Sequence, residues 1–455
     1  MLGIVVHSLI GVASHIRSVR LRGGCEHAVS VLQCQVMEDC TGSKVYWRCA
    51  IEVEQDKRKR EWLKKFSKPD ILCDDVTNLG SGDCFNLIDN TWTCVPNFLA
   101  CYTFGYSCKD LSTLNNASSS WKDSCLADGA GSTGRTWSGN LEVVFRAKPW
   151  ILLMENVPAA LKGKNYQQMV SDLASLGYQL VSLELNSADC GLPQDRRRGW
   201  FTAVRTDLAG KLHDRNFRDL VDSMKIQRHL PLRRFLLDPL DPYLAEITKE
   251  KLSRSQVKAL AQAKAKAMAK KTKSAKATAK ATAKITKRSG DKWKADHWRV
   301  RRSLNMLPAS EAPSPIRRMQ AENGMCDREM DLYRVITEGP AMVDPEVQPC
   351  VELKHSAPRV VGCKNRRRAG STSCLLPSSK LMLMPPLVPS PRFLTGLEAM
   401  QIQGVDGHHL SSDRIMTDGE YMHLAGNAFS GGACAVMFLA TIASLDLRDL
   451  VQRLR

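Results

Sequence analysis

The sequence predicts an α/β fold built on a doubly wound, mostly parallel sheet, with a smaller region inserted into it. Residues 21–205 alternate between strand-like and helix-like segments, the pattern typical of βαβ units. Residues 150–154, Trp-Ile-Leu-Leu-Met, form an apolar run typical of a strand buried on both faces. Residues 45–52 form a second strand-like run that ends in Glu52. An acidic residue at the tip of the second strand is a feature of such sheets, so these three segments predict the fold class.

Length and composition agree with this fold. The 455 residues can hold one large α/β domain and a second, smaller one, and 43% hydrophobic residues suffice for a core. The 16 cysteines show no Cys-x-x-Cys spacing, which argues against zinc ribbons, predicts no metal site and fits a reducing compartment.

No run reaches the length of a membrane span, and we expect no membrane partner. Residues 1–13 are apolar but lack a basic leader, so we expect no secretory signal. Residues 1–25 carry three arginines and no acid, which leaves an organelle transit peptide open beside a nuclear location.

Most of the positive charge lies in one tract. The chain carries a net charge of +18, and residues 251–290 hold 13 Lys or Arg and no acid, which leaves +5 for the rest. Residues 261–284 are almost entirely Ala, Lys and Thr, without an apolar face that could join a core. We expect a solvated insertion that binds phosphates without reading sequence and loses affinity as salt rises.

A thiol and a carboxyl group lie in two short segments of the catalytic region. Cys108 lies in residues 105–112, Gly-Tyr-Ser-Cys-Lys-Asp-Leu-Ser, and Glu155 lies in residues 154–158, Met-Glu-Asn-Val-Pro. Carbon 5 of cytosine is too poor a nucleophile to accept a methyl group unaided, so a thiolate must add to C6 while an acid relieves charge at N3. The adjacent Lys109 is expected to favour the ionised thiol. The pattern predicts Cys108 as the nucleophile and Glu155 as the acid.

Two guanidinium groups follow in residues 194–198, Gln-Asp-Arg-Arg-Arg. We expect Arg198 to hold the O2 edge of the base and the charge near the thiolate, and Arg196 to order the loop. Taken alone, an Arg-Arg-Arg run is more often a solvated face, and Glu-Asn-Val-Pro could be an ordinary exit from a strand.

Five strings in this order resemble motifs of the C5-cytosine DNA methyltransferases: residues 105–112, 155–157, 190–204, 393–404 and 426–429. The first is similar to Gly-x-Pro-Cys-Gln-x-x-Ser, with Ser107 in place of Pro and Lys109 in place of Gln. The last resembles Gly-Asn-Ser, with Ala428 in place of Ser. The resemblance implies a Rossmann-like S-adenosylmethionine-dependent sheet and methyl transfer to cytosine in double-stranded DNA, with the target base flipped out and covalently bound to Cys108.

The resemblance also implies cofactor-binding residues. Glu52 would accept hydrogen bonds from the ribose hydroxyls of S-adenosylmethionine, and Asp75 would accept one from the adenine amine. Glu54 or Asp74 could take these places, because each is also an acid at a strand end. Asn427 of the closing motif is the third expected cofactor contact.

The glycine turn of the family is incomplete. Against Asp-Leu-Phe-x-Gly-x-Gly-Gly, residues 18–24 keep only Gly23 and Gly24, and a placement around residues 9–11 keeps fewer glycines. This departure puts cofactor affinity, and with it activity, in question.

The organisation predicted from these landmarks has four parts. The first is a divergent N-terminal segment, and the second is the catalytic and cofactor-binding domain. A target-recognition region follows, with the basic insertion 251–290 and a basic patch at 364–368, and the last part completes the catalytic sheet and cofactor pocket with a buried helix from Gly431. In order, these parts are residues 1–20, 21–205, 206–385 and 386–455.

Two other functions compete with DNA methylation. One is a tRNA cytosine-5 methyltransferase on the same fold, against which the absence of that branch's Cys-Phe-Thr tripeptide argues. The other is a catalytically silent DNA- or chromatin-binding homologue, which the broken glycine turn and the basic tract favour.

Overall fold

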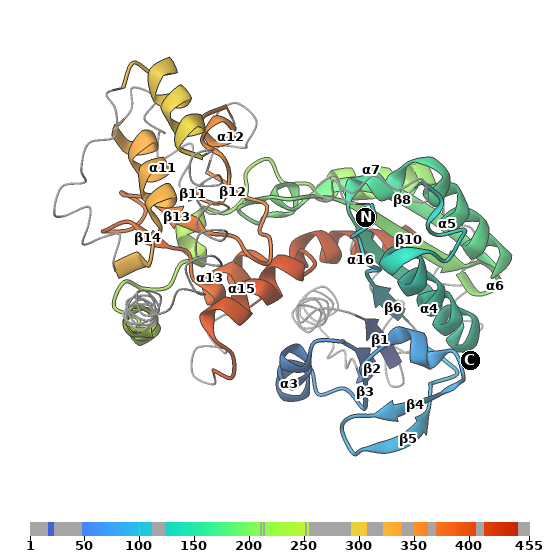
Figure 1. Ribbon diagram of the computed structural model, residues 1–455. Coiled ribbons are helices and arrows are strands. Elements are labelled where there is room, and N and C mark those ends of the chain that lie inside the picture. The colour runs from blue at the N-terminus through green and yellow to red at the C-terminus, as the bar shows by residue number, and fades with distance from the viewer. Residues whose placement is uncertain are drawn as a thin grey trace, which may run out of the picture. The chain divides into compact units, whose positions relative to one another are not determined.

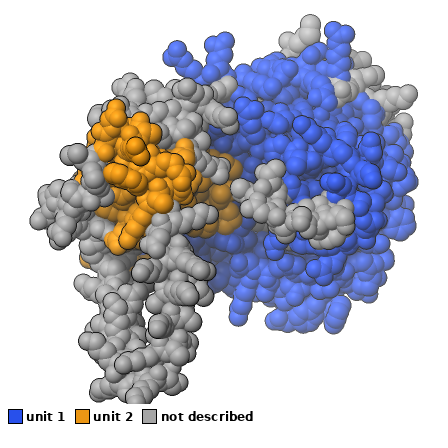
Figure 2. Space-filling model, turned by 45° about the horizontal axis from the view of Figure 1, so that its top comes forward, with its two compact units in different colours: residues 1–230, 400–455 blue, residues 231–399 orange. Residues whose placement is uncertain are grey.

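A computed structural model gives the fold of the chain. It describes residues 17–21, 48–99, 101–111, 123–209, 212, 214–250, 253, 293–306, 322–338, 350–362, 370–405 and 414–444. The chain divides into two compact units, coloured separately in Figure 2: unit 1 comprises residues 1–230 and 400–455, and unit 2 comprises residues 231–399.

Unit 1 contains a seven-stranded sheet of order β3-β2-β1-β6-β7-β10-β8 (Figure 1). The strands are β1 (Arg17–Leu21), β2 (Arg48–Val53), β3 (Ile71–Cys73), β6 (Cys101–Phe104), β7 (Ile151–Asn156), β8 (Tyr178–Asn186) and β10 (Arg197–Arg205). The strands from β3 to β7 pair in parallel, and β10 runs antiparallel to both of its neighbours. The strand order reverses at β1, between β2 and β6, and ligands of such sheets bind outside the carboxyl ends of the strands at this switch point.

Helices cover both faces of this sheet. The described helices of unit 1 are α3 (Lys57–Phe66), α4 (Gly131–Ala147), α5 (Gly163–Ser175), α6 (Thr206–Ala209), α7 (Asp214–Met224), α15 (Asp418–Asn427) and α16 (Gly431–Ser444). On β7, Leu152 belongs to one apolar cluster with α4 and α5, whereas Leu153 belongs to another with α7 and α16. All six residues of β7 are buried, as the apolar run predicted. The doubly wound α/β class expected from the sequence is therefore the observed one.

The C-terminal part of unit 1 differs from the expectation that it completes the sheet. Its described residues form α15 and α16, and the sheet receives no strand from them. The buried helix expected from Gly431 is α16. Residues 206–230 also stay with unit 1, beyond the predicted boundary at 205, because Phe217 of α7 packs with Met437 of α16.

The segment Asp418–Ser444, which holds α15 and α16, is long and apolar enough to cross a membrane by length and composition, contrary to the sequence-based expectation. Of its most apolar window, 72% is buried inside the protein, as in the core helix of a globular domain.

Unit 2 is built around a three-stranded antiparallel sheet, β11-β13-β14. Its labelled elements are β11 (Cys350–Glu352), β12 (Thr372–Ser373), β13 (Leu381–Leu383), β14 (Arg392–Phe393), α11 (Asp327–Glu338) and α12 (Ala357–Gly362). Val335 of α11 and Met382 of β13 lie in its apolar core. Buried Glu398 holds the strand exit by accepting two hydrogen bonds from Arg392, at 2.6 and 2.8 Å. This unit occupies most of the region predicted for target recognition.

Several predicted features lie outside the described residues: Gly23 and Gly24, the region around 9–11, nearly all of the Lys/Ala tract at 251–290, and the basic patch at 364–368. The remaining elements are β4 (Asp83–Asn86), β5 (Thr91–Cys94), β9 (Gln194–Asp195), α13 (Gly396–Ile402), and the 3-10 turns Val76–Leu79, Pro158–Leu161, Ser187–Cys190 and Leu232–Phe235.

Candidate active site

The loop that carries Cys108 leaves the carboxyl end of β6. Cys108 is exposed, so a substrate could reach its thiol. The loop begins at Gly105, where a Cβ atom would lie only 3.0 Å from the Phe429 ring. Phe429 in turn packs edge-on against Trp200 of β10, with ring centroids 5.9 Å apart. Glycine at position 105 therefore lets the segment after α15 approach the base of the nucleophile loop.

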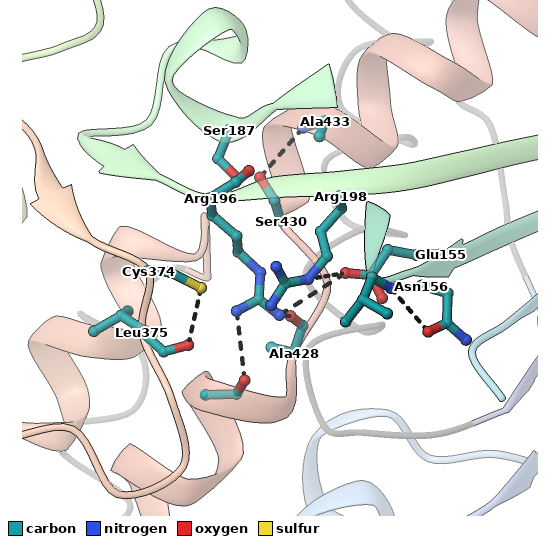
Figure 3. Close-up of polar contacts among 12 residues, drawn as sticks. Glu155, Asn156, Ser187, Arg196, Arg198, Cys374, Leu375, Ala428, Ser430 and Ala433 are labelled. Atoms are coloured by element: carbon teal, nitrogen blue, oxygen red, sulfur yellow. Dashed lines mark hydrogen bonds and ion pairs between the residues drawn. The ribbon is translucent and has the colours of Figure 1, made fainter. Parts of the chain in front are cut away.

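Glu155 lies on β7, directly beside β10 in the sheet. Trp200 is the backbone partner of Glu155, and Arg198 lies two residues before Trp200 on the same strand. The Arg198 Nε atom lies 3.0 Å from Glu155 Oε1, and the two side chains are 16% and 10% exposed (Figure 3). The ion pair is thus mostly shielded from water but keeps an open side.

Arg196 is oriented differently. It is 3% exposed, and its Nη2 donates to the Ala428 carbonyl at 2.8 Å and its Nη1 to the Gly426 carbonyl at 3.5 Å (Figure 3). Its distance to Glu155 Oε1 is longer, 3.9 Å. Arg196 therefore fixes the end of α15 to the strand pair that carries Glu155, as a cation does at a helix C-terminus.

The electrostatics join Cys108 to this pair. Although the Cys108 side chain is exposed at the surface, the protein atoms packed around it partly desolvate its thiol. This desolvation and the negative charge of Glu155 raise the pKa of the thiol, while Arg198 and, more weakly, Arg196 lower it. Lys109 was expected to favour the ionised thiol, but the cations that do so are Arg198 and Arg196, and desolvation outweighs them, so the pKa of the thiol is raised. The Cys108 thiol thus lies within electrostatic range of both Glu155 and Arg198.

Two acidic side chains lie where the parallel strands next to β1 end. Glu52, near the end of β2, is 1% exposed and accepts a hydrogen bond at 2.5 Å from the Ser67 hydroxyl. Asp75 follows β3 and accepts from Thr77 N–H at 3.0 Å and from Gln55 Nε2 at 2.7 Å. The Gln55 bond holds the loops after β2 and β3 together, so the structure brings these two predicted residues to the same edge.

The alternative acids are placed less suitably. Glu54 accepts a hydrogen bond from Asp56 N–H at 2.9 Å and lies 3.7 Å from the Lys59 ammonium. Its carboxylate is therefore already bound by residues at the start of α3. Asp74 is exposed and accepts at 3.4 Å from Asn78.

Asn427 is exposed at the end of α15, and its amide donates to the His423 carbonyl at 3.0 Å within the same helix. Burial and Lys59 lower the pKa of His423, while Asp56 and Glu54 act in the opposite direction. An ion pair of 3.2 Å also joins Arg58 to Glu420. The helix that ends in Asn427 therefore packs against the start of α3, just beyond Glu52.

Asn156 has a role that the sequence did not assign. Its side-chain amide donates to the Tyr106 carbonyl at 3.1 Å, and its oxygen accepts from Val157 N–H at 2.8 Å. Asn156 thereby ties the end of β7 to the nucleophile loop. The only signal was its place in the Glu-Asn-Val string.

Comparison with known proteins agrees with these motifs. A family model described as C-5 cytosine-specific DNA methylase matches residues 128–430, which include Glu155, Arg196, Arg198 and Asn427, whereas Cys108 precedes them.

Two curated relatives match parts of the chain. The DNA (cytosine-5-)-methyltransferase DMT5 of Cryptococcus neoformans is 26% identical over 184 residues, 40% of this chain and 7% of that protein. The Type II methyltransferase M.NgoFVII of Neisseria gonorrhoeae is 32% identical over 106 residues, 23% of this chain and 26% of that protein. The match thus spans about a quarter or less of each relative.

Among solved structures, S. pombe Dnmt2 methyltransferase superposes with a TM-score of 0.47 and 11% identity, covering 93% of this chain and 97% of that one.

Proposed function

Since the chain belongs to the C-5 cytosine-specific DNA methylase family, we propose that it transfers a methyl group from S-adenosylmethionine to C5 of cytosine in DNA. The observation that supports the proposal is the 3.0 Å ion pair between Glu155 and Arg198 where β7 ends and β10 begins, with Cys108, on the loop after β6, within electrostatic range of both. A nucleophile, an acid and a cation are the groups that this reaction requires, and each comes from a different strand of a rigid sheet.

The chain's own residues account for the activation of the base. Cys108 loses its proton to solvent, to which the residue is exposed, and its sulfur forms a bond to C6, while Glu155 donates a proton to N3, so that C5 becomes nucleophilic. Arg198 holds the Glu155 carboxyl in place and stabilises the thiolate. After methyl transfer, the C5 proton leaves to water and its bonding electrons form the C5–C6 double bond. The electron pair of the S–C6 bond returns to the sulfur of Cys108, and N3 returns its proton to Glu155.

The resting thiol is mostly protonated, because its pKa is raised. Among the charged groups that act on this thiol, Glu155 opposes its ionisation and Arg198 favours it, so the balance between these two side chains affects how readily Cys108 ionises.

The residues present fit the cofactor. S-adenosylmethionine supplies an electrophilic methyl group. Glu52 would accept from its ribose hydroxyls and Asp75 from its adenine amine, at the switch point of the sheet. Ser67 holds the Glu52 carboxylate at 2.5 Å, which fixes it for such contacts.

The proposed substrate is DNA, for which the family description and the named DNA methyltransferase relative are the support. Recognition would fall to unit 2, and the target base would leave the duplex to reach Cys108. Transfer RNA and a catalytically silent DNA-binding role are the alternatives that the experiment must separate.

The test is transfer of a tritiated methyl group to cytosine-containing DNA duplexes and to tRNA, presented separately. The proposal predicts label at C5 of cytosine in DNA, and none with Cys108→Ser. Cys326→Ser, at another exposed cysteine, is the matched control and should keep activity.

Label on tRNA alone would overturn the proposed substrate but keep the chemistry. Absence of both labelling and S-adenosylmethionine binding would favour the silent homologue.

A further inference from the structure

The nucleophile loop of this chain lacks the proline of the related pattern and is fixed in another way. The residue before the nucleophile is Ser107, which is 5% exposed. Its backbone N–H donates to Thr136 Oγ1 at 2.9 Å, and its hydroxyl accepts from the Ser132 hydroxyl at 2.8 Å. Ser132 and Thr136 lie on the first two turns of α4. Both the main chain and the side chain of Ser107 are therefore held by this helix.

A second contact holds the other side of Cys108. Asp110 Oδ2 accepts from Thr133 N–H at 2.9 Å, and Asp110 N–H donates to Thr133 Oγ1 at 3.2 Å. Helix α4 starts at Gly131 after Ala130, which offers no side-chain cap. Asp110 supplies the missing acceptor from the loop, in a reciprocal pattern like that of a capping box but between two separate segments.

The Thr136 hydroxyl accepts a hydrogen bond from the nucleophile loop while it keeps a hydrogen bond to the backbone of its own helix. Its Oγ1 donates to the Ser132 carbonyl at 2.8 Å while it accepts from Ser107. It is 6% exposed, so water cannot easily replace either partner. The hydroxyl thus links the helix backbone to the residue that precedes the nucleophile.

We propose that Ser107 and Asp110 are positioning residues, which fix Cys108 against α4 through Ser132, Thr133 and Thr136. A proline restricts φ by its ring, whereas serine has no such restriction, and the hydrogen bonds from α4 replace the ring here. The role of these residues in methyl transfer rests on the proposed function, whereas their effect on the order of the loop does not.

A proline at position 107 should have an effect opposite to the one that the related motif suggests. Ser107→Pro would restore the residue of the related motif, but it would also remove the N–H that Thr136 accepts. Restoring the proline should therefore lower activity in this chain rather than raise it. Because misplacement of a reacting group by about 1 Å costs on the order of 10²-fold in rate, we expect kcat to fall roughly 10- to 100-fold.

The experiment uses the full chain with Ser107→Pro, Thr136→Val, Thr136→Ser and the double variant Ser107→Pro with Thr136→Val. Valine matches threonine in shape but lacks the hydroxyl, while serine keeps it. The hydroxyl of Ser138 is exposed on the same helix, so Ser138→Ala is the matched control.

Two measurements follow each variant: hydrogen exchange of the peptide covering residues 105–111, and kcat with KM for DNA and cofactor. Faster exchange and a fallen kcat at unchanged KM are expected for Ser107→Pro and Thr136→Val, with recovery in Thr136→Ser. The double variant should be no slower than the worse single one, because both remove the same bond.

Parental kcat and exchange in Thr136→Val, or equal losses in Ser138→Ala, would overturn the positioning role. If the parent has no methyl transfer at all, the proposed function fails, and the exchange data still decide whether α4 orders the loop.

Discussion

Arg196 and Arg198 lie two residues apart, and replacing each by methionine should separate stability from activity. In Arg196→Met, the buried Ala428 carbonyl loses a charged donor at 2.8 Å. A hydrogen bond to a charged group contributes about 1.5–3 kcal/mol, and leaving its buried partner unpaired costs about 1–3 kcal/mol. Since Arg196 is 3% exposed, water replaces little of this, and we expect a loss of about 3–5 kcal/mol. At about 2–4 °C per kcal/mol, the melting temperature should fall by roughly 6–20 °C.

Arg198→Met should behave in the opposite way. Its ion pair with Glu155 is mostly shielded too, but after its loss Glu155 keeps Arg196 as a second cation at 3.9 Å. The cost should therefore be smaller, about 1–2 kcal/mol, which lowers the melting temperature by about 2–8 °C. Turnover should nevertheless fall by about 10²-fold or more, because the cation that stabilises the thiolate is gone.

The measurements are thermal unfolding of the free protein by circular dichroism at pH 7, and the rate of methyl transfer. Arg197→Met is the control between the two sites. Arg197 is 67% exposed, and its ion pair within the described part of the chain is with surface Glu184, so the change should affect neither quantity. If Arg196→Met melts with the parent, or Arg198→Met loses as much stability as Arg196→Met, the assigned division between the two residues is refuted.

Four further outcomes are expected. Glu155→Gln should lower turnover by about 10²- to 10⁴-fold with DNA affinity nearly unchanged, since an amide cannot supply the proton at N3; turnover within about tenfold of the parent would make Glu155 structural. Glu52→Ala should weaken S-adenosylmethionine binding by roughly 1.5–3 kcal/mol in calorimetric titration, and unchanged affinity would contradict its ribose contact. The rate of Cys108 alkylation should rise with pH, and the midpoint of this rise should lie above that of a free thiol because the pKa of Cys108 is raised. Arg198→Met should move this midpoint to a still higher pH. A midpoint at or below that of a free thiol would contradict the raised pKa. Deleting residues 261–288 should lower the affinity for all DNA sequences alike and make that affinity less dependent on salt, while the melting temperature stays unchanged. Loss of folding would instead show that the tract packs in the core.

The central sheet was predictable because its strands have strong local signals. The buried run before Glu155 and the strand before Glu52 appear as β7 and β2, in the class of sheet expected. The C-terminal residues were expected both to complete this sheet and to form a buried helix from Gly431. The helix is confirmed as α16, whereas the described C-terminal residues of unit 1 add no strand to the sheet. Their apolar pattern indicates burial but does not say which sheet, if any, they join.

The polar contacts around Cys108 could not be predicted, because they join distant parts of the chain. Asn156 reaches a carbonyl 50 residues away, and Ser107 is held by Thr136, 29 residues later. The raised pKa of Cys108 was also missed. Sequence shows the neighbouring Lys109 but neither the burial of the loop nor the approach of Glu155.

The most direct test of the account is covalent trapping on a DNA duplex that contains 5-fluorocytosine, in the presence of S-adenosylmethionine. Fluorine at C5 cannot leave as a proton does, so the bond between sulfur and C6 should persist. The account predicts a denaturation-resistant adduct whose peptide map places the base on Cys108, and no adduct with Cys108→Ser. An adduct on a different cysteine, or none on either DNA or RNA carrying the same base, would contradict the assignment of Cys108 as the nucleophile.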